Sequence, residues 1–415
     1  MTSRLLLRDP NFSRVWWSGL ISNVGNGALF IALPAYVYTE TGSTLQTAAV
    51  VIAAALPSTV VGQFAGVLVD RLDYRWVLLW SNIALAAVTL MYLLDVHAAW
   101  WFLALIAFVS SSVGQFLGPA ENALLPTLVP EERLGEANSL NSLNNSLARL
   151  VGPALGGFVL AQYGFTTVIL FDALTFLVAA LLISSVQAPT FDRPHAQTRV
   201  AFLKEWKEGL AVIAERPALK VLLVVVSIAA FGEGFISTLM VPFVTDVLGG
   251  NGQTLGLIMS VQAVGGLIGA WVMGRQADRR PALQLLAWGG LGSGLLLVAY
   301  FNYALIYPVI WPALVITAIA GTPFAMFGIA QNLGLQRASP PETRGRVFSA
   351  CYGLMGLTQL AGMGVSGLLG ERVGVLVINV DAATYLIAGS LAWWALYRGV
   401  GRSEGEPEPK VSRTV

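Results

Sequence analysis

Long apolar stretches alternate with short polar segments along almost the whole chain. Twelve of these stretches are long enough to cross a membrane as a helix, which takes about 20 mainly apolar residues. They are centred near residues 26, 56, 86, 109, 149, 175, 234, 263, 291, 315, 357 and 386. The pattern therefore predicts an all-α integral membrane protein with twelve transmembrane helices.

One long polar segment divides the twelve predicted spans into two groups of six. We expect an N-terminal six-helix bundle over 1–186, a cytoplasmic linker over 187–220, a C-terminal bundle over 221–400 and a cytoplasmic tail over 401–415. Within the linker, the stretch FLKEWKEGLAVI places its apolar side chains on one helical face. That spacing is typical of an amphipathic helix on the inner membrane surface, with a loosely ordered linker as the alternative.

Composition and charge agree with a membrane protein. The chain is 56% hydrophobic and 11% charged, whereas soluble domains have about 45–50% and 25%. With the N-terminus inside, nearly all Lys and Arg fall on the cytoplasmic side, as cytoplasmic loops require; Arg372 alone lies outside and Arg149 lies within a span. We predict a multi-pass protein of the cell (inner) membrane with both termini cytoplasmic. The net charge of +1 gives no indication of a nucleic-acid partner.

The two halves of the chain resemble each other at an offset of 207 to 210 residues. VGNGALFIALP (24–34) corresponds to FGEGFISTLMVP (231–242), and FDALTFLVA (171–179) corresponds to VDAATYLIA (380–388). Two further segment pairs occur in the same order. Parallel repeats of this kind form the two halves of secondary transporters, with the substrate held near the midplane between them. We therefore expect two pseudo-symmetric six-helix bundles around a central cavity.

The loop after the second span, GVLVDRLDYRWVL, resembles the signature loop of the major facilitator superfamily. Its characteristic positions, with a degenerate copy in the second half, are Gly66, Asp70, Arg71, Arg75, Gly274, Asp278 and Arg279. Glycine lets helices approach closely, and a carboxylate beside a helix N-terminus meets the positive end of the helix dipole. The resemblance implies an inside latch, in which Asp70 docks on span eleven in the outward-open state. A tight turn with ordinary surface charges is the alternative.

The fifth span contains ARLVGPALGG, which resembles the antiporter motif of drug exporters in the same superfamily. The motif residues are Gly152, Pro153, Gly156 and Gly157; the glycines permit close packing, and the proline bends the helix and frees a carbonyl. Together with NFSRVWW and PPETRGRVFS, the chain is most similar to the macrolide-efflux branch of drug:proton antiporters. The resemblance implies export of hydrophobic or amphipathic small molecules by proton antiport with alternating access. We expect a monomer in contact with membrane lipids.

Glu233 is a carboxylate in the middle of the seventh span, where a charge costs roughly 2.5–3.5 kcal/mol on insertion scales. Its counterpart in the repeat is Asn26, where many relatives carry an acid. A carboxyl group in a low dielectric can load and release a proton as access alternates. We predict that Glu233 couples transport to protons or binds a cationic substrate. A structural glutamate that is hydrogen-bonded to a neighbouring span is the alternative.

Three other polar features lie within the predicted spans. Glu121 and Arg149 are expected to form an ion pair between spans four and five, either as a switch in proton coupling or as a static bridge, unless Glu121 reaches the inner interface. Asp172 and Asp381 are repeat counterparts on spans six and twelve, for which we expect a structural role. By position alone, the central cavity is expected to be lined, beside Glu233, by Asn23, Asn26, Phe30, Phe231, Gln262, Gln331 and Asn332.

Missing motifs limit the remaining function classes. The chain has no Gly-x4-Gly-Lys-Ser/Thr loop for an ATP-driven pump and no metallohydrolase or nucleophile-elbow motif. We therefore expect neither an enzyme nor a bound cofactor or metal. Export of a dedicated metabolite such as a siderophore, or movement of a lipid, is an alternative with the same fold. A non-transporting membrane scaffold or sensor is an alternative from another class.

Overall fold

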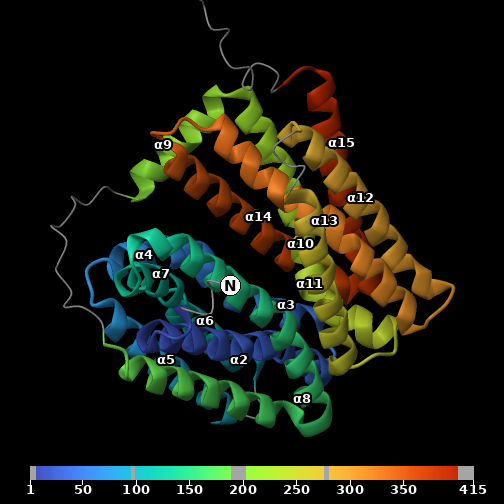
Figure 1. Ribbon diagram of the computed structural model, residues 1–415. Coiled ribbons are helices and arrows are strands. Elements are labelled where there is room, and N and C mark those ends of the chain that lie inside the picture. The colour runs from blue at the N-terminus through green and yellow to red at the C-terminus, as the bar shows by residue number, and fades with distance from the viewer. Residues whose placement is uncertain (1–5, 95–98, 188–201, 275–279, 401–415) are drawn as a thin grey trace, which may run out of the picture.

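The computed structural model describes residues 6–94, 99–187, 202–274 and 280–400 (Figure 1). Every regular element in these ranges is a helix. Asp278 and Arg279 of the predicted second latch copy lie outside the described residues, as does the predicted tail.

The N-terminal half begins with the long helix α2. Its elements are α2 (Pro10–Thr41), α3 (Thr44–Val60), α4 (Gly62–Val69), α5 (Tyr74–Leu90), η1 (Met91–Leu94), α6 (Trp100–Gly114), α7 (Leu117–Leu128), η2 (Glu131–Arg133) and α8 (Leu134–Ser184). Helical geometry breaks inside α8 at Gly164, which has φ 79° and ψ 173°. Glycine adopts this left-handed backbone without the steric cost that a Cβ would add, so α8 provides two spans.

The C-terminal half repeats this order after the linker helix α9. Its elements are α9 (Phe202–Glu215), α10 (Pro217–Pro242), the π-helical η3 (Phe243–Val247), α11 (Gly252–Gly274), α12 (Ala282–Asn302), η5 (Tyr303–Leu305), α13 (Ile310–Ala338), α14 (Arg344–Val373), η6 (Val375–Ile378) and α15 (Asn379–Tyr397).

The structure confirms the predicted fold class. Within the described residues, nine helical stretches are long and apolar enough to cross a membrane. One of these contains both parts of α8, while α3 with α4 and the more polar α14 provide the other two spans of the twelve. The two halves form separate bundles, which lie close together at one end and diverge toward the end that carries α4, α7 and α9 (Figure 1).

Glycines set the helix packing in the same way in both halves. In the N-terminal half, a Cβ at Gly156 would overlap the backbone of Ala28, so α8 lies directly against α2. In the C-terminal half, a Cβ at Gly362 would overlap the carbonyl oxygen of Phe231, so α14 lies directly against α10. Close approach of this kind depends on small residues, because helices in a membrane associate through packing rather than through the hydrophobic effect.

The linker helix packs against the C-terminal bundle. Ile213 of α9 is 2% exposed and belongs to the core of that bundle, and a Cβ at Gly209 would overlap the carbonyl oxygen of Arg346 on α14. Glu208 and Arg346 form an ion pair of 2.9 Å. The predicted amphipathic helix is therefore present, but the buried part of its apolar face contacts protein instead of a membrane surface.

Candidate functional site

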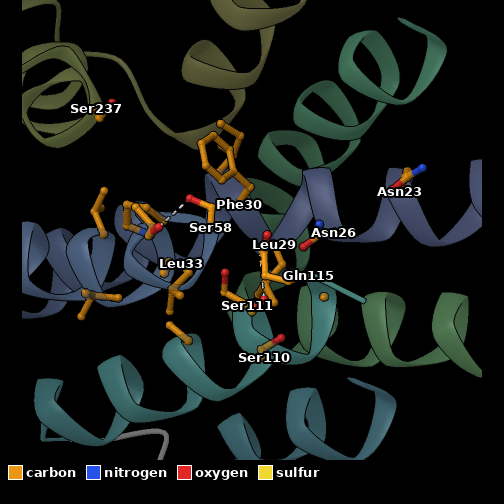
Figure 2. A pocket seen from close by; sticks show the side chains of 18 of the residues that line it. Asn23, Asn26, Leu29, Phe30, Leu33, Ser58, Ser110, Ser111, Gln115 and Ser237 are labelled. Atoms are coloured by element: carbon orange, nitrogen blue, oxygen red, sulfur yellow. Dashed lines mark hydrogen bonds between the residues drawn. The ribbon is translucent and has the colours of Figure 1, made fainter. Parts of the chain in front are cut away.

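A cavity of about 710 Å³ lies between the two halves. It is lined by α2, α3, α5, η1, α6, α7 and α8 from the N-terminal half and by α10, α11 and α14 from the C-terminal half. Four of the predicted cavity residues line it: Asn23, Asn26, Phe30 and Gln262. In Figure 2, Ser237 of α10 lies across the cavity from Ser110 and Ser111 of α6. The cavity is therefore located where the repeat predicts it.

The wall formed by the N-terminal half carries most of the polar side chains of the cavity, among apolar ones such as Leu29, Phe30 and Leu33. Beside Asn23 and Asn26, it contains Ser22, Ser58, Ser110, Ser111, Gln115, Glu121, Asn122, Asn141 and Asn145. The sequence analysis missed most of these residues. A usable signal was the spacing of Asn141 and Asn145, because residues four apart share one face of a helix. Polar side chains repeated at this spacing inside an apolar span indicate a face turned away from lipid.

The wall formed by the C-terminal half is mainly apolar and contains three methionines. Met240, Met259 and Met363 come from α10, α11 and α14 and lie with Ile236, Val241 and Leu255. Methionine has a flexible, polarisable side chain that adapts to ligands of different shape. The cavity is thus amphipathic: most of its hydrogen-bonding groups come from the N-terminal half, and its adaptable methionines come from the C-terminal half.

Three of the predicted cavity residues lie elsewhere. The ring of Phe231 packs against Phe235 at a centroid distance of 5.5 Å. The Gln331 side chain is buried and its Nε2 lies 3.4 Å from the Sδ of Met355. Asn332 accepts a hydrogen bond of 2.9 Å from Tyr352 and lines a separate small hollow between α11 and α13. The repeat gives the level of a residue in the membrane, but the rotation of its helix decides which neighbour it faces.

Glu233 also points away from the cavity in this structure. Its Oε1 accepts a hydrogen bond of 2.8 Å from the hydroxyl of Tyr385 on α15. The cavity lining does not include Glu233, although it includes the repeat counterpart Asn26. The alternative expectation, a glutamate bonded to a neighbouring span, thus describes this conformation.

The expected ion pair between Glu121 and Arg149 is not formed in this structure. Glu121 lines the cavity, and its Oε1 lies 3.1 Å from the position that a Cβ at Gly19 would take. Arg149 is exposed and follows the cavity residue Asn145 by four positions, which places both on the same face of α8. Neither residue takes part in an ion pair found among the described residues. The predicted bridge is therefore absent from this conformation.

The Gly-Pro-x-x-Gly-Gly motif joins three helices. Gly152 and Gly156 face α2, and a Cβ at Gly152 would lie 3.0 Å from the Cα of Gly27. Gly157 faces the other half, where a Cβ would overlap the carbonyl oxygen of Gly252. Ser260 of α11 donates a hydrogen bond of 2.8 Å to the carbonyl of Leu150, in the turn before Pro153. The motif therefore stabilises the N-terminal half and also connects it to α11.

Two carboxylates connect the halves at the end remote from α4, α7 and α9. The Oε2 of Glu371 on α14 accepts hydrogen bonds of 3.0 Å from Ser43 and 3.3 Å from Thr44 at the start of α3. Asp246 accepts a hydrogen bond from the hydroxyl of Tyr38 on α2. These contacts join both halves and close this end of the cavity.

The latch loop lies at the opposite, open end and makes no contact of the predicted kind. A Cβ at Gly66 or at Gly274 would meet nothing within 4 Å, so neither glycine permits a close approach in this conformation. Asp70 and Arg71 are exposed. Asp70 follows the C-terminus of α4, and it is Asp73 that caps a helix N-terminus, since its Oδ1 accepts from the backbone N–H of Arg75 at 3.0 Å.

Arg75 of the latch loop stabilises the end of α8. Its guanidinium donates a hydrogen bond of 2.6 Å to the carbonyl of Ser184, and the guanidinium of Arg14 donates one of 2.6 Å to the carbonyl of Ser185. The last carbonyls of a helix lack partners within the helix, and cations there interact favourably with the helix dipole.

Two pseudo-symmetric six-helix bundles with an amphipathic cavity between them define a membrane transporter, not an enzyme. The family model of the Major Facilitator Superfamily matches residues 15–332 and 222–414, and the chain belongs to this superfamily. It is 26% identical over 367 residues to macrolide efflux protein A of Streptococcus pyogenes, covering 88% of this chain and 90% of that protein. It is 29% identical over 378 residues to the multidrug efflux pump Tap of Mycolicibacterium fortuitum, covering 87% and 89%.

The fold is also similar to solved structures of transporters. A bacterial homologue of the iron transporter ferroportin in the inward-facing state superposes with a TM-score of 0.74 at 17% sequence identity, covering 94% of this chain and 98% of that chain.

Proposed function

We propose that the protein exports hydrophobic or amphipathic small molecules from the cytoplasm in exchange for protons, by alternating access. The observation that carries this proposal is an amphipathic cavity between two halves that are joined at one end and apart at the other. With the N-terminus inside, as the distribution of Lys and Arg predicts, the open end faces the cytoplasm. The names of the similar efflux proteins support export as the direction.

The two cavity walls suit a molecule with two unlike faces. A rigid amphiphile that turns its hydroxyl and amine groups toward the N-terminal half satisfies the Asn and Ser side chains of that wall. Its apolar face then lies against the methionines of the opposite wall, which tolerate different shapes. A dedicated metabolite or a lipid remains the alternative, and a panel of substrates separates it from drug export.

Glu121 is the carboxyl group best placed for proton exchange within the cavity, because it lies on the cavity wall. A cationic substrate and a proton compete for one carboxylate, so binding of the first releases the second. We propose that Arg149, on the same face of α8 as the cavity residue Asn145, pairs with Glu121 after the cationic substrate has left and until a proton binds the carboxylate.

The experiment for this proposal measures proton release from the purified protein in weak buffer when a macrolide is added. We expect the wild-type protein to release protons and the Glu121→Gln variant to release none, because glutamine carries no exchangeable proton of this kind. Glu40→Gln is the matched control, since Glu40 is exposed at the end of α2 and is absent from the cavity lining. Undiminished release from Glu121→Gln would contradict the role of Glu121.

A further inference from the structure

Behind the wall of the C-terminal half, two carboxyl groups and a phenol meet between α10 and α15. Glu233 accepts its 2.8 Å hydrogen bond from Tyr385. Asp381 lies one helical turn before Tyr385, and its Oδ1 lies 2.9 Å from the position of a Cβ at Gly232, the residue before Glu233. The three side chains therefore form one cluster, named here the Glu233 cluster.

The Glu233 cluster has two buried members and an unpartnered oxygen, while Glu233 itself is partly buried. Asp381 is 1% exposed and Tyr385 is 2% exposed, and the Oδ1 of Asp381 has no hydrogen-bond partner. The rings of Phe324 and Phe327 on α13 pack against the Tyr385 ring at 5.2 and 5.3 Å. Among the ion pairs of the described residues, none involves Glu233 or Asp381.

Two ionised carboxylates without a basic partner are not stable together in such a place. Burial of an isolated charge is strongly unfavourable, and two carboxylates that share a site do not both ionise readily. The described helices packed near the Glu233 cluster present no charge to it. Helix α13 contributes Phe324 and Phe327, and α14 contributes Gly362 and Met363 against Gly234. Helix α12, which packs against Tyr385 through Gly290, contains no charged residue. At least one of the two carboxyl groups, Glu233 or Asp381, must therefore carry a proton.

The repeat provides an internal comparison for the Glu233 cluster. The framework is the same in the N-terminal half, where Asp172 and Thr175 lie against Gly25 as Asp381 and Thr384 lie against Gly232. In both halves the threonine donates to the carbonyl of its aspartate, at 2.7 and 2.8 Å. The shared Asp-x-x-Thr turn thus packs closely against a glycine of the first helix in each half.

Two positions differ between the halves, and they differ together. Where the C-terminal half has Glu233 and Tyr385, the N-terminal half has Asn26 and Phe176 at offsets of 207 and 209 residues. Asn26 and Phe176 both line the central cavity, whereas their counterparts are absent from its lining and bond to each other. The fold does not need an acid and a phenol here, since the other half is built without them. The pair is therefore an addition with a function of its own.

We propose that the Glu233 cluster is an occluded proton-binding site, distinct from the substrate cavity, whose proton exchanges when Glu233 turns from Tyr385 toward the cavity. Asn26 shows that a side chain at this level and on this face of the helix reaches the cavity. The inference rests on the proposed proton-coupled export for its role in transport, but not for the existence of the site. Glu121 then exchanges with the substrate directly, and the Glu233 cluster holds a proton while the substrate is bound.

The test of the site is infrared spectroscopy of the full-length protein in lipid membranes without substrate. A protonated carboxyl group gives a C=O band apart from that of a carboxylate, and the band moves to higher frequency when a hydrogen bond to it is lost. We expect Glu233→Gln to remove one such band and Tyr385→Phe, which copies Phe176, to move the same band to higher frequency. Tyr300→Phe is the control, because the buried Tyr300 hydroxyl lies 4.0 Å from the Sδ of Met240 and bonds to no carboxylate. Identical carboxyl bands in wild type, Glu233→Gln and Tyr385→Phe would overturn the proposal.

The role in transport is tested separately by the pH dependence of substrate export in vesicles. The double variant Glu233→Asn with Tyr385→Phe gives the C-terminal half the residues that the N-terminal half has at Asn26 and Phe176. We expect this variant to bind substrate as the wild type does and to lose the response of export to an imposed proton gradient. A variant with an unchanged gradient response refutes the role of the Glu233 cluster. If wild type itself shows no gradient response, the proposed proton antiport fails, while the infrared result still decides whether the proton site exists.

Discussion

A methyl group added at Gly157 is expected to force the two halves apart at their closed end. The new Cβ would overlap the carbonyl oxygen of Gly252 and lie 3.0 Å from its carbonyl carbon, and neither backbone atom can yield as a flexible side chain would. Overpacking of this kind costs about 1–3 kcal/mol. If this free-energy cost is present in only one of the two conformations, the ratio of their populations changes by roughly 5–150-fold.

The shift is measured as distances between spin labels on cysteine pairs that bridge the halves. Glu40→Cys with Asn251→Cys reports on the closed end, and Glu132→Cys with Gln336→Cys reports on the open end; all four positions are exposed. The native Cys351 is buried, so it does not interfere. In Gly157→Ala we expect the first distance to lengthen and the second to shorten. Distances that match those of the unsubstituted pairs would contradict the assignment of the closed end.

Gly66→Ala is expected to disfavour the other conformation, in contrast to Gly157→Ala, which disfavours the present one. A Cβ at Gly66 meets nothing within 4 Å in this conformation, so the variant is expected to keep the present state unharmed. The latch loop is expected to dock when the open end closes, and the added methyl group then hinders that closure. The open-end distance then stays long even when substrate and a proton gradient favour the other state.

Gly156→Ala is expected to lower stability without favouring either conformation. Gly156 is the neighbour of Gly157 in sequence, but its Cβ would overlap the backbone of Ala28 within the same half, and that contact does not depend on how the halves are placed. We expect a loss of about 1–3 kcal/mol, seen as a lower midpoint of thermal unfolding in detergent.

The control for Gly156→Ala is Gly266→Ala, at a glycine inside α11 whose Cβ would meet nothing within 4 Å. Alanine is favoured over glycine within a helix by about 1 kcal/mol. Gly266→Ala therefore shows the effect of helix propensity on stability without any steric overlap. Equal unfolding midpoints for the two variants would show that α8 and α2 are not packed as closely as described.

The spans and the position of the cavity could be predicted from the sequence, for clear physical reasons. Membrane thickness fixes the length of a span, and the internal repeat places a cavity at the interface of the two halves. Asn23, Asn26, Phe30 and Gln262 were found in this way, and all of them line the cavity. The repeat also explains why α14 is a span despite its weaker hydropathy, since it occupies the place that α8 has in the other half.

The orientation of individual side chains could not be predicted from the same pattern. Successive residues in a helix differ by about 100° in direction, so a residue at the right depth, such as Phe231 or Gln331, can face a neighbouring helix. Glu233 is the most instructive case, because its direction is set by the hydroxyl of Tyr385, which is 152 residues away in the chain. A comparison of Phe176 with Tyr385 across the repeat would have indicated this partner.

The central claim, export coupled to protons through the cavity, is tested most directly in inside-out vesicles that contain the purified protein. An imposed proton gradient, acidic inside, should drive accumulation of a macrolide in wild-type vesicles, and collapse of the gradient should stop it. Vesicles with Glu121→Gln should accumulate none under the same gradient, while those with Glu40→Gln should match wild type. Accumulation that ignores the gradient, or equal accumulation by Glu121→Gln, would contradict this account.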